Sequence, residues 1–259
     1  MRLFSKLIEN RNLLKNLIRR ELKGRYAGSA GGFIWSVIHP LTMLVSYSFV
    51  AAILQLKPPD GAVNFPIFLF CGIVPWTLFT DTVLRSCGII VENKSLITKT
   101  IMPAEMLPVA ITLSNLVHHA IGLGILLTVL VVFHTVPLSA IGIVLYLPIL
   151  ILFAQGLGWL VSGLQVFLRD TLQAIQILLF LWQWFTPLFY SLTQVHEPYR
   201  TAMMFNPMAI VITGYRNSLL GLPQPDPLYV ATAAGASLLM FVLGGLIFRQ
   251  AKPAFADVL

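Results

Sequence analysis

MRLFSKLIENRNLLKNLIRRELKGRYAGS, residues 1–29, decides the fold, because it leads within a few residues into an apolar segment that opens FIWSVIHP at Phe33. Apolar side chains recur in it at helical spacing, and most basic ones are displaced from that stripe. The apolar residues are Leu3, Phe4, Leu7, Ile8, Leu14, Leu17, Ile18 and Leu22, and the basic ones are Lys6, Arg11, Lys15, Arg19, Arg20 and Lys23. Such a helix lies flat at a membrane surface. Positive charge just before a spanning segment also predicts a cytoplasmic amino terminus.

Composition identifies an integral membrane protein. Of the 259 residues 57% are hydrophobic and only 10% are charged, whereas about a quarter are charged in soluble domains. The net charge of +7 does not indicate a nucleic-acid partner, because the basic residues lie beside apolar segments, where anionic lipid is the expected partner. Cys71 and Cys87 lie in or at the end of one apolar segment, and we interpret them as small apolar residues.

Six apolar runs are long enough to cross a bilayer, which takes about 20 residues. They cover residues 33–56, 65–86, 107–133, 138–166, 172–190 and 228–248. We therefore predict an all-α protein with an amphipathic interfacial helix over 1–30 and a six-helix transmembrane domain over 31–259. Six crossings place both termini in the cytoplasm. Fourteen of the seventeen Lys and Arg residues then lie inside, and Lys57, Arg200 and Arg216 lie outside, as the positive-inside rule requires.

The segment between the fifth and sixth runs, residues 191–221, contains an apolar patch over Pro207–Leu220 that is too short to cross. Pro187, Pro198 and Pro207 indicate backbone that breaks at membrane depth, which is tolerated only where protein or a watery cavity receives it. A re-entrant helical segment at a pore mouth fits this pattern. A surface-lying helix that caps the bundle fits it equally well.

Nothing in the chain indicates catalysis or a cofactor. The sequence lacks a glycine-rich loop ending in Gly-Lys-Ser or Gly-Lys-Thr, and His118 and His119 are expected to pack between helices without a metal. Asp81 lies four residues before Arg85, which predicts an intrahelical ion pair. Because intramembrane charges mark ion pathways, their scarcity argues against an ion-driven carrier. We expect the energy to come from another polypeptide.

The segment between the second and third runs, residues 88–106, is a candidate docking site for a cytosolic partner. It mixes charged and apolar residues, and Pro103 ends any helix there. An amphipathic helix of this kind can enter a groove on a partner, although periodicity alone fits an ordinary solvated loop as well.

Aromatic residues gather around two prolines. Trp76 and Phe79 follow Pro75, and Pro187 is flanked by Trp182, Trp184, Phe185, Phe189 and Tyr190. Aromatic faces bind sugars while excluding ions. The alternative interpretation is that these side chains anchor the protein at the membrane interface.

The run LKGRYAGSAGGFIWSVIHPLTMLV, Leu22–Val45, strongly resembles the opening of ABC-2 type exporter permeases, particularly those that move lipid-linked O-antigen, capsule or teichoic acid polymers. ENKSLITKTIMPAEMLPV, FLRDT, FTPLFYSLTQV and FNPMAIVITGYRNSLLG agree in order along the chain. Two departures stand out. The family usually has Asn where His39 precedes Pro40, and MPAE, Met102–Glu105, lacks the arginine that the family often carries.

The resemblance implies roles for three sets of residues. It implies an ATPase-coupling helix containing Glu92, Asn93, Lys94, Leu96, Ile97, Lys99, Pro103 and Glu105. It implies that Arg20, Arg25, Tyr26 and Trp35 close the interfacial helix onto the first span. It implies gate helices over 191–221, with gate residues Pro187, Asn206, Pro207, Tyr215 and Arg216.

The hypothesis from sequence is therefore a permease subunit of the bacterial inner membrane. It would form a homodimer around a channel, recruit two cytosolic ATPases that carry ATP and Mg²⁺, and export a lipid-linked polysaccharide. An ABC-2 permease for a drug or small lipid is the first alternative. A secondary carrier and a passive scaffold or channel are the others.

Overall fold

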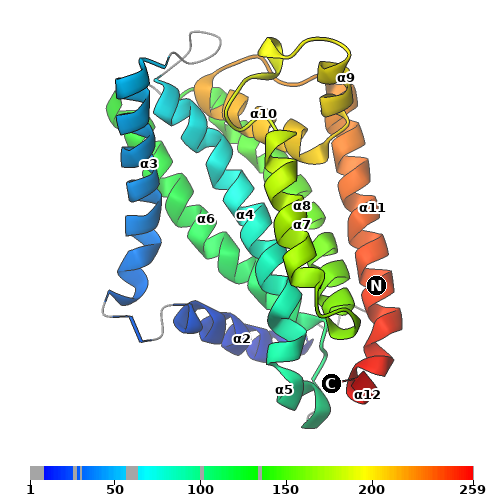
Figure 1. Ribbon diagram of the computed structural model, residues 1–259. Coiled ribbons are helices and arrows are strands. Elements are labelled where there is room, and N and C mark those ends of the chain that lie inside the picture. The colour runs from blue at the N-terminus through cyan, green and yellow to red at the C-terminus, as the bar shows by residue number, and fades with distance from the viewer. Residues whose placement is uncertain are drawn as a thin grey trace.

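The computed structural model describes residues 9–25, 28–29, 31–56, 64–99, 102–133 and 136–258. The prediction of an all-α chain is confirmed for these residues, which contain helices and no strand (Figure 1). Tyr26 lies outside them, as do the side chain of Lys99 and the first eight residues of the predicted interfacial helix.

Among the described residues, five helical segments are long and apolar enough to cross a membrane. They are α3 (Trp35–Leu54, after a short 3₁₀ turn over Gly32–Ile34), α4 (Phe65–Glu92), α6 (Met106–Phe133), α7 (Ile143–Phe167, after a 3₁₀ turn over Leu138–Gly142) and α11 (Pro227–Ala251). Proline and a side-chain cap fix the start of α11, where the Asp226 carboxylate accepts the Leu228 N–H at 2.8 Å.

The predicted fifth span over 172–190 is helical only in its first part, and the crossing itself stays a prediction. The helix found there, α8, covers Thr171–Trp184, which is 14 residues or about 21 Å, shorter than the hydrocarbon core of about 30 Å. Pro187 is the physical reason, because proline lacks an N–H group and disfavours helical backbone at the preceding Thr186. The chain continues as turns from Phe185 to Ser191.

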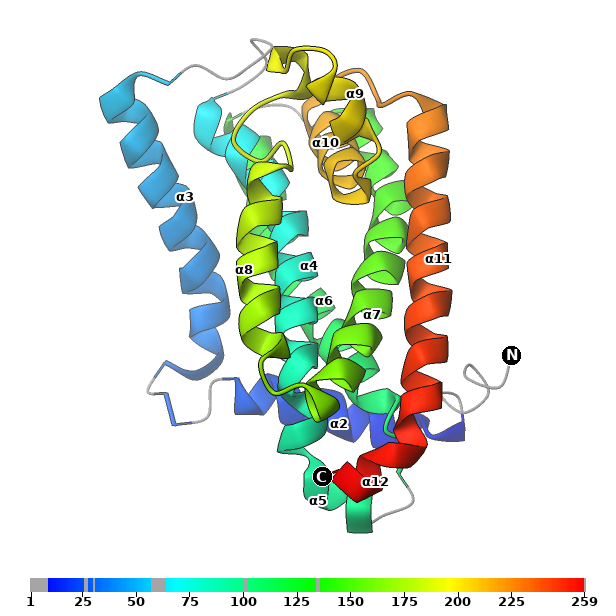
Figure 2. The same cartoon turned by 45° about the vertical axis from the view of Figure 1, so that its right-hand side comes forward.

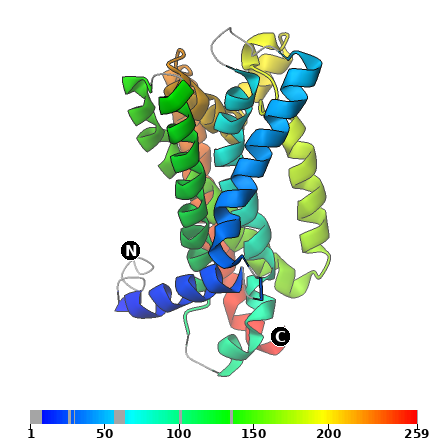
Figure 3. The same ribbon diagram turned by 90° about the vertical axis from the view of Figure 1, so that its left-hand side faces the viewer.

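Short elements occupy the two ends of the bundle. At one end, the α2 end, α2 (Arg11–Gly24) lies across the long helices, close to α5 (Lys94–Lys99) and α12 (Phe255–Val258) (Figures 1 and 3). At the other, the α10 end, lie the 3₁₀ turn Leu192–Gln194, α9 (Tyr199–Met204) and α10 (Pro207–Leu220). The apolar patch predicted over Pro207–Leu220 is thus a short helix with those bounds.

Helix α4 is the centre of the bundle, and α3 is its edge. In the apolar window of α4 78% of the residues are buried, compared with 6% in α3; α3 lies beside α4 and α6 (Figure 2). Helices α7 and α11 pack most closely, because a Cβ atom on Gly244 would lie 2.0 Å from the carbonyl oxygen of Gly156. Such glycine contacts let membrane helices approach without side chains between them.

Candidate functional site

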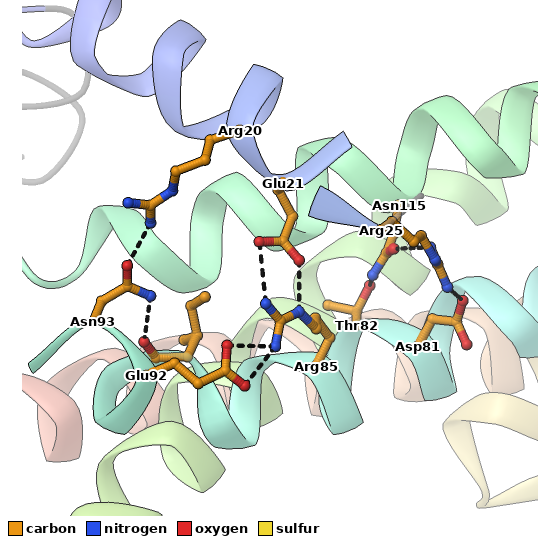
Figure 4. A network of polar contacts seen from close by, with 10 residues as sticks. Arg20, Glu21, Arg25, Asp81, Thr82, Arg85, Glu92, Asn93 and Asn115 are labelled. Carbon is orange, nitrogen blue, oxygen red and sulfur yellow. Dashed lines mark hydrogen bonds and ion pairs between the residues drawn. The ribbon is translucent and has the colours of Figure 1, made fainter. Parts of the chain in front are cut away.

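Helix α2 is joined to α4 by a row of polar contacts (Figure 4). Arg20 donates to Asn93 Oδ1 at 2.5 Å, and Glu21 accepts from Arg85 Nε at 2.5 Å. One turn further along, Arg25 forms an ion pair with Asp81. Two residues of α2, together with its C-cap residue Arg25, thus contact the half of α4 that leads into α5, so α2 and this part of α4 are mechanically linked.

The predicted intrahelical pair between Asp81 and Arg85 is wrong. Arg85 lies between two other carboxylates, those of Glu21 and Glu92, and its Nη1 is 2.7 Å from Glu92 Oε1. Spacing of four residues does bring side chains together on a helix, but α2 supplies Glu21 and the end of α4 itself supplies Glu92, and both carboxylates hydrogen-bond the guanidinium. Sequence spacing could not reveal these partners, because Arg85 and Glu21 are 64 residues apart.

Polar residues behind the ion pairs extend the site into the bundle. Arg25 also donates to Asn115 at 3.0 Å, and Asn115 donates to Thr82 at 3.3 Å. Two cavities, of about 420 Å³ and 470 Å³, share Arg25, Asp81 and Asn115 as lining residues. The larger reaches towards Glu21 and Arg85, and the other is lined by Trp35 and His39. Asn115 and Thr82 were missed by the sequence analysis.

Helix α5 projects from the α2 end and corresponds to the predicted docking segment. Asn93 is buried at the junction with α4, where its amide donates to the carbonyl of Ile89 at 2.8 Å. Leu96 and Ile97 are half-buried, and Ile97 packs against a core cluster that includes Ile90. Lys94, Ser95 and Thr98 are exposed. The segment therefore has an inner side fixed to the bundle and an outer polar side open to a partner.

The chain after α5 is held by the carboxyl-terminal region. Glu105, only 12% exposed, accepts a hydrogen bond from Lys252 Nζ at 2.6 Å, and its carbonyl accepts from Trp159 Nε1 at 3.2 Å. Phe255 is fully buried and packs edge-on against Phe248, with ring centroids 5.4 Å apart. Pro103, two residues before Glu105, is half-buried. Sequence analysis missed Lys252, Trp159 and Phe255.

Asn206 anchors the start of α10. Its side-chain oxygen accepts the Met208 N–H and the Trp182 Nε1–H, both at 3.1 Å, while its amide donates to the Phe185 carbonyl at 3.1 Å. Pro207 occupies the first turn, where a missing N–H costs nothing. One side chain thus joins α10 to the end of α8 and to the turn that follows it.

Arg216 is buried, although the sequence analysis counted it among the outside charges. The residue is only 2% exposed, and its guanidinium donates to the carbonyls of Phe68 at 3.1 Å and Leu188 at 2.8 Å. The guanidinium also lies 3.7 Å from the centroid of the Phe68 ring, a cation–π distance. A Cβ on Gly72 would approach its Nη2 to 2.6 Å. Arg216 therefore connects α10, α4 and the turn around the buried Pro187.

The prediction that His119 packs between helices is confirmed. Its Nε2 lies 2.7 Å from the hydroxyl of Tyr215 in α10, and its Nδ1 lies 3.2 Å from the Val74 carbonyl in α4. His118 contacts the carbonyl of Ser114 in its own helix at 3.1 Å, and its ring centroid lies 6.3 Å from that of Phe33, just before α3. Over the part of the chain that the structure describes, no His, Cys, Asp and Glu residues group as metal ligands.

The predicted channel-lining aromatic residues divide into two groups. Trp76 and Phe79 are buried, at 6% and 0% exposed, so they pack inside the chain and cannot line a surface of it in this conformation. Trp182 is half-buried against Phe79, with ring centroids 5.5 Å apart.

The second aromatic group is open at the surface. Trp184 is 55% and Phe185 67% exposed, and Phe189 and Tyr190 are half-buried beside them. The sequence analysis missed three further exposed rings, those of Phe180, Tyr199 and Phe205. Phe180 extends this group along α8, with its ring centroid 6.5 Å from that of Trp184, whereas Phe205 packs against Tyr229 of α11. Spacing of four residues between Phe180 and Trp184 is the one sequence signal for this extension.

Comparison with known proteins identifies the family. Residues 12–220 match the family described as ABC-2 type transporter. The chain belongs to this family. An O-antigen export system permease protein, RfbA, of Myxococcus xanthus is 30% identical to this ABC-2 protein over 261 residues, which cover 99% of both chains.

More distant relatives of this ABC-2 protein have related names. An O-antigen export system permease protein RfbA of Klebsiella pneumoniae is 26% identical over 251 residues, covering 96% of this chain and 95% of the relative. The polysialic acid transport protein KpsM of Escherichia coli is 25% identical over 115 residues, 44% of each chain. With its apolar helices, family membership makes this a multi-pass membrane protein.

Proposed function

We propose that this chain is the permease subunit of an ATP-driven exporter that moves a lipid-linked polysaccharide across the bacterial cytoplasmic membrane. The observation that carries the proposal is similarity along the whole length to a protein named as an O-antigen export permease. Two copies would enclose the path, and each would bind one cytosolic ATPase that supplies ATP and Mg²⁺.

In this proposal the α2 end faces the cytoplasm and α5 inserts into the ATPase. Its exposed side, Lys94, Ser95 and Thr98, would contact the ATPase, while its half-buried side transmits the movement to α4. The polar row from α2 to α4 would move with it as one unit. A two-state change in packing would require these contacts to differ between the two states.

Helix α8 together with the turn over residues 185–191 would complete a fifth crossing, and α9 and α10 would form the re-entrant segment at the outer face. The open aromatic group around Trp184 would then face the polymer, since aromatic rings pack against the C–H faces of sugars. The exposed side of α3, where Val45, Phe49 and Ile53 are 61–67% exposed, is available to lipid and to a second copy.

Topology is tested by cysteine labelling in intact cells. The native Cys71 and Cys87 are buried, so a single Thr193→Cys should react from outside, whereas Thr98→Cys should react only after permeabilisation. Labelling of both from the same side would contradict six crossings.

Function is tested in inside-out vesicles containing the permease, its ATPase and a labelled lipid-linked glycan. We expect ATP-dependent uptake that falls at least tenfold in Lys94→Glu with Thr98→Glu and is retained in the matched control Lys23→Glu, also exposed at the α2 end. Uptake without the ATPase would overturn an ATP-driven permease. ATP-dependent transport of a drug or small lipid in place of the glycan would favour the first alternative.

A further inference from the structure

One side of α2 carries two parallel rows of side chains. Arg11, Lys15 and Arg19 recur every four residues and are exposed. Leu14, Ile18 and Leu22 recur at the same spacing beside them and are half-buried. Because residues four apart share a helix face, α2 presents a cationic row next to an apolar row.

The basic row is not neutralised by its own helix. Between Arg11 and Gly24 the single acidic residue is Glu21, and its carboxylate is bound to Arg85 on α4. The charge of the row is therefore available to an external anion.

The basic row and the docking segment lie on different sides of α2. Arg20 marks the side of α2 that faces this segment, because it donates to Asn93 at the start of α5. Arg11 precedes Arg20 by nine residues and Lys15 precedes it by five, so their side chains lie about 180° and 140° from that of Arg20 around the helix axis. A cytosolic partner bound to α5 would lie on the Arg20 side, away from Arg11 and Lys15.

The two rows also lie at the level where a membrane surface is expected. Helix α2 runs across the ends of the long apolar helices (Figure 3), where hydrocarbon gives way to headgroups. The apolar row holds α2 on the bundle, because Leu14 and Ile18 pack against the same core cluster as Ile97 of the docking segment. The cationic row beside it is exposed and matches the phosphates of anionic lipids.

We infer that Arg11, Lys15 and Arg19 bind anionic phospholipid headgroups of the cytoplasmic leaflet, and that this binding sets the position of α2 and thereby of the docking segment. The path runs through Arg20 to Asn93 and through Glu21 to Arg85. The lipid-binding half stands on the geometry of α2 alone. The regulatory half rests on the function proposed above.

The test uses the complete transporter in vesicles of phosphatidylcholine, with or without phosphatidylglycerol. Retained lipid is measured by mass spectrometry, and ATP hydrolysis is measured in the same samples. The test variant is Arg11→Gln with Lys15→Gln and Arg19→Gln. The matched control, Lys23→Gln with Arg169→Gln and Arg249→Gln, removes the same charge at other exposed positions.

We expect phosphatidylglycerol to raise hydrolysis several-fold in the wild type and in the control. The test variant should need at least about tenfold more phosphatidylglycerol for the same effect, since each basic residue near an anionic surface contributes about fivefold to binding. The charge-preserving variant Arg11→Lys with Lys15→Arg and Arg19→Lys should match the wild type. High salt should remove the difference by screening.

Three results would overturn the inference in distinguishable ways. Equal lipid retention by the wild type and the test variant would overturn the binding site. Loss of ATPase-subunit capture by the test variant in lipid-free detergent would identify the row as an ATPase surface instead. A fall in lipid retention with unchanged stimulation would overturn the regulation alone. Failure of the proposed function would be seen separately, as absence of ATP-driven export by the wild type in every lipid mixture.

Discussion

At the α2 end the elements are joined mainly by ion pairs between partly exposed side chains, whereas at the α10 end Arg216 and Tyr215 join them through buried hydrogen bonds. The Arg25 and Asp81 side chains are 38% and 41% exposed, whereas Arg216 is only 2% exposed. Exposed ion pairs contribute little individually and exchange readily with water. Removing one partner of a buried, hydrogen-bonded charge is far more costly.

The comparison indicates a division of mechanical roles. Contacts at the α2 end can break and re-form at small cost, which suits elements that follow a partner. Contacts at the α10 end hold α10, the end of α8 and α4 in one arrangement, which suits a frame for a conduit. Breaking contacts at each end should therefore give effects of different size and kind.

The largest effect is expected at Arg216. In Arg216→Met the carbonyls of Phe68 and Leu188 lose their donors in a buried site, and we expect a loss of about 3–5 kcal/mol in the free energy of unfolding. Unfolding in detergent, followed by denaturant titration, measures it. The control Arg200→Met breaks a half-exposed contact to Glu197 at the same end and should cost less than about 1 kcal/mol. Equal losses in the two variants would remove the contrast between the ends.

How much of this could be predicted depends on the range of the interaction. Hydropathy located five long helices because each is a local run, and Pro207–Leu220 was recognised because its length is also local. Pro187 indicated a break in the backbone, but the residue at which α8 ends could not be predicted, because the apolar run continues to Tyr190.

Pairing between distant residues could not be predicted. Lys252 and Glu105 are 147 residues apart, and nothing in either neighbourhood indicates the other. The predicted ion pair between Asp81 and Arg85 was wrong for the complementary reason. Helical spacing alone made the two residues partners, whereas in the folded chain Asp81 pairs with Arg25 and Arg85 pairs with Glu21. Burial of Arg216 required knowing that three elements meet around it. The sequence analysis counted Arg216 as an outside charge because it relied only on the assignment of residues 191–221 to the outer side of the membrane.

A medium effect is expected from breaking the ion pair between Lys252 and Glu105, which holds the end of the 88–106 segment. Glu105→Lys or Lys252→Glu alone places like charges together, and we expect each to loosen α5, seen as faster amide exchange over Lys94–Lys99, and to destabilise by about 1–2 kcal/mol. The exchanged pair Glu105→Lys with Lys252→Glu should restore protection.

The matched control for these charge-reversal variants is Arg249→Glu. Arg249 is exposed in the last turn of α11. This variant should leave amide exchange over α5 unchanged. Failure of the exchanged pair to restore protection would mean that the single variants act through something other than this contact, and that the segment is fixed by Phe255 and Ile97 packing alone.

The smallest effect is expected at Asp81, and it sharpens the assignment of ion pairs. A double-mutant cycle between Asp81→Asn and Arg25→Gln should give a coupling of about 0.5–1 kcal/mol. The corresponding cycle between Asp81→Asn and Arg85→Gln should give a coupling near zero, because Arg85 is bound to Glu21 and Glu92. Both are measured by denaturant titration at low and high salt, and the first coupling should shrink at high salt by screening. A larger coupling in the second cycle would restore the intrahelical pair, and α2 would then lose one of its three polar links to α4.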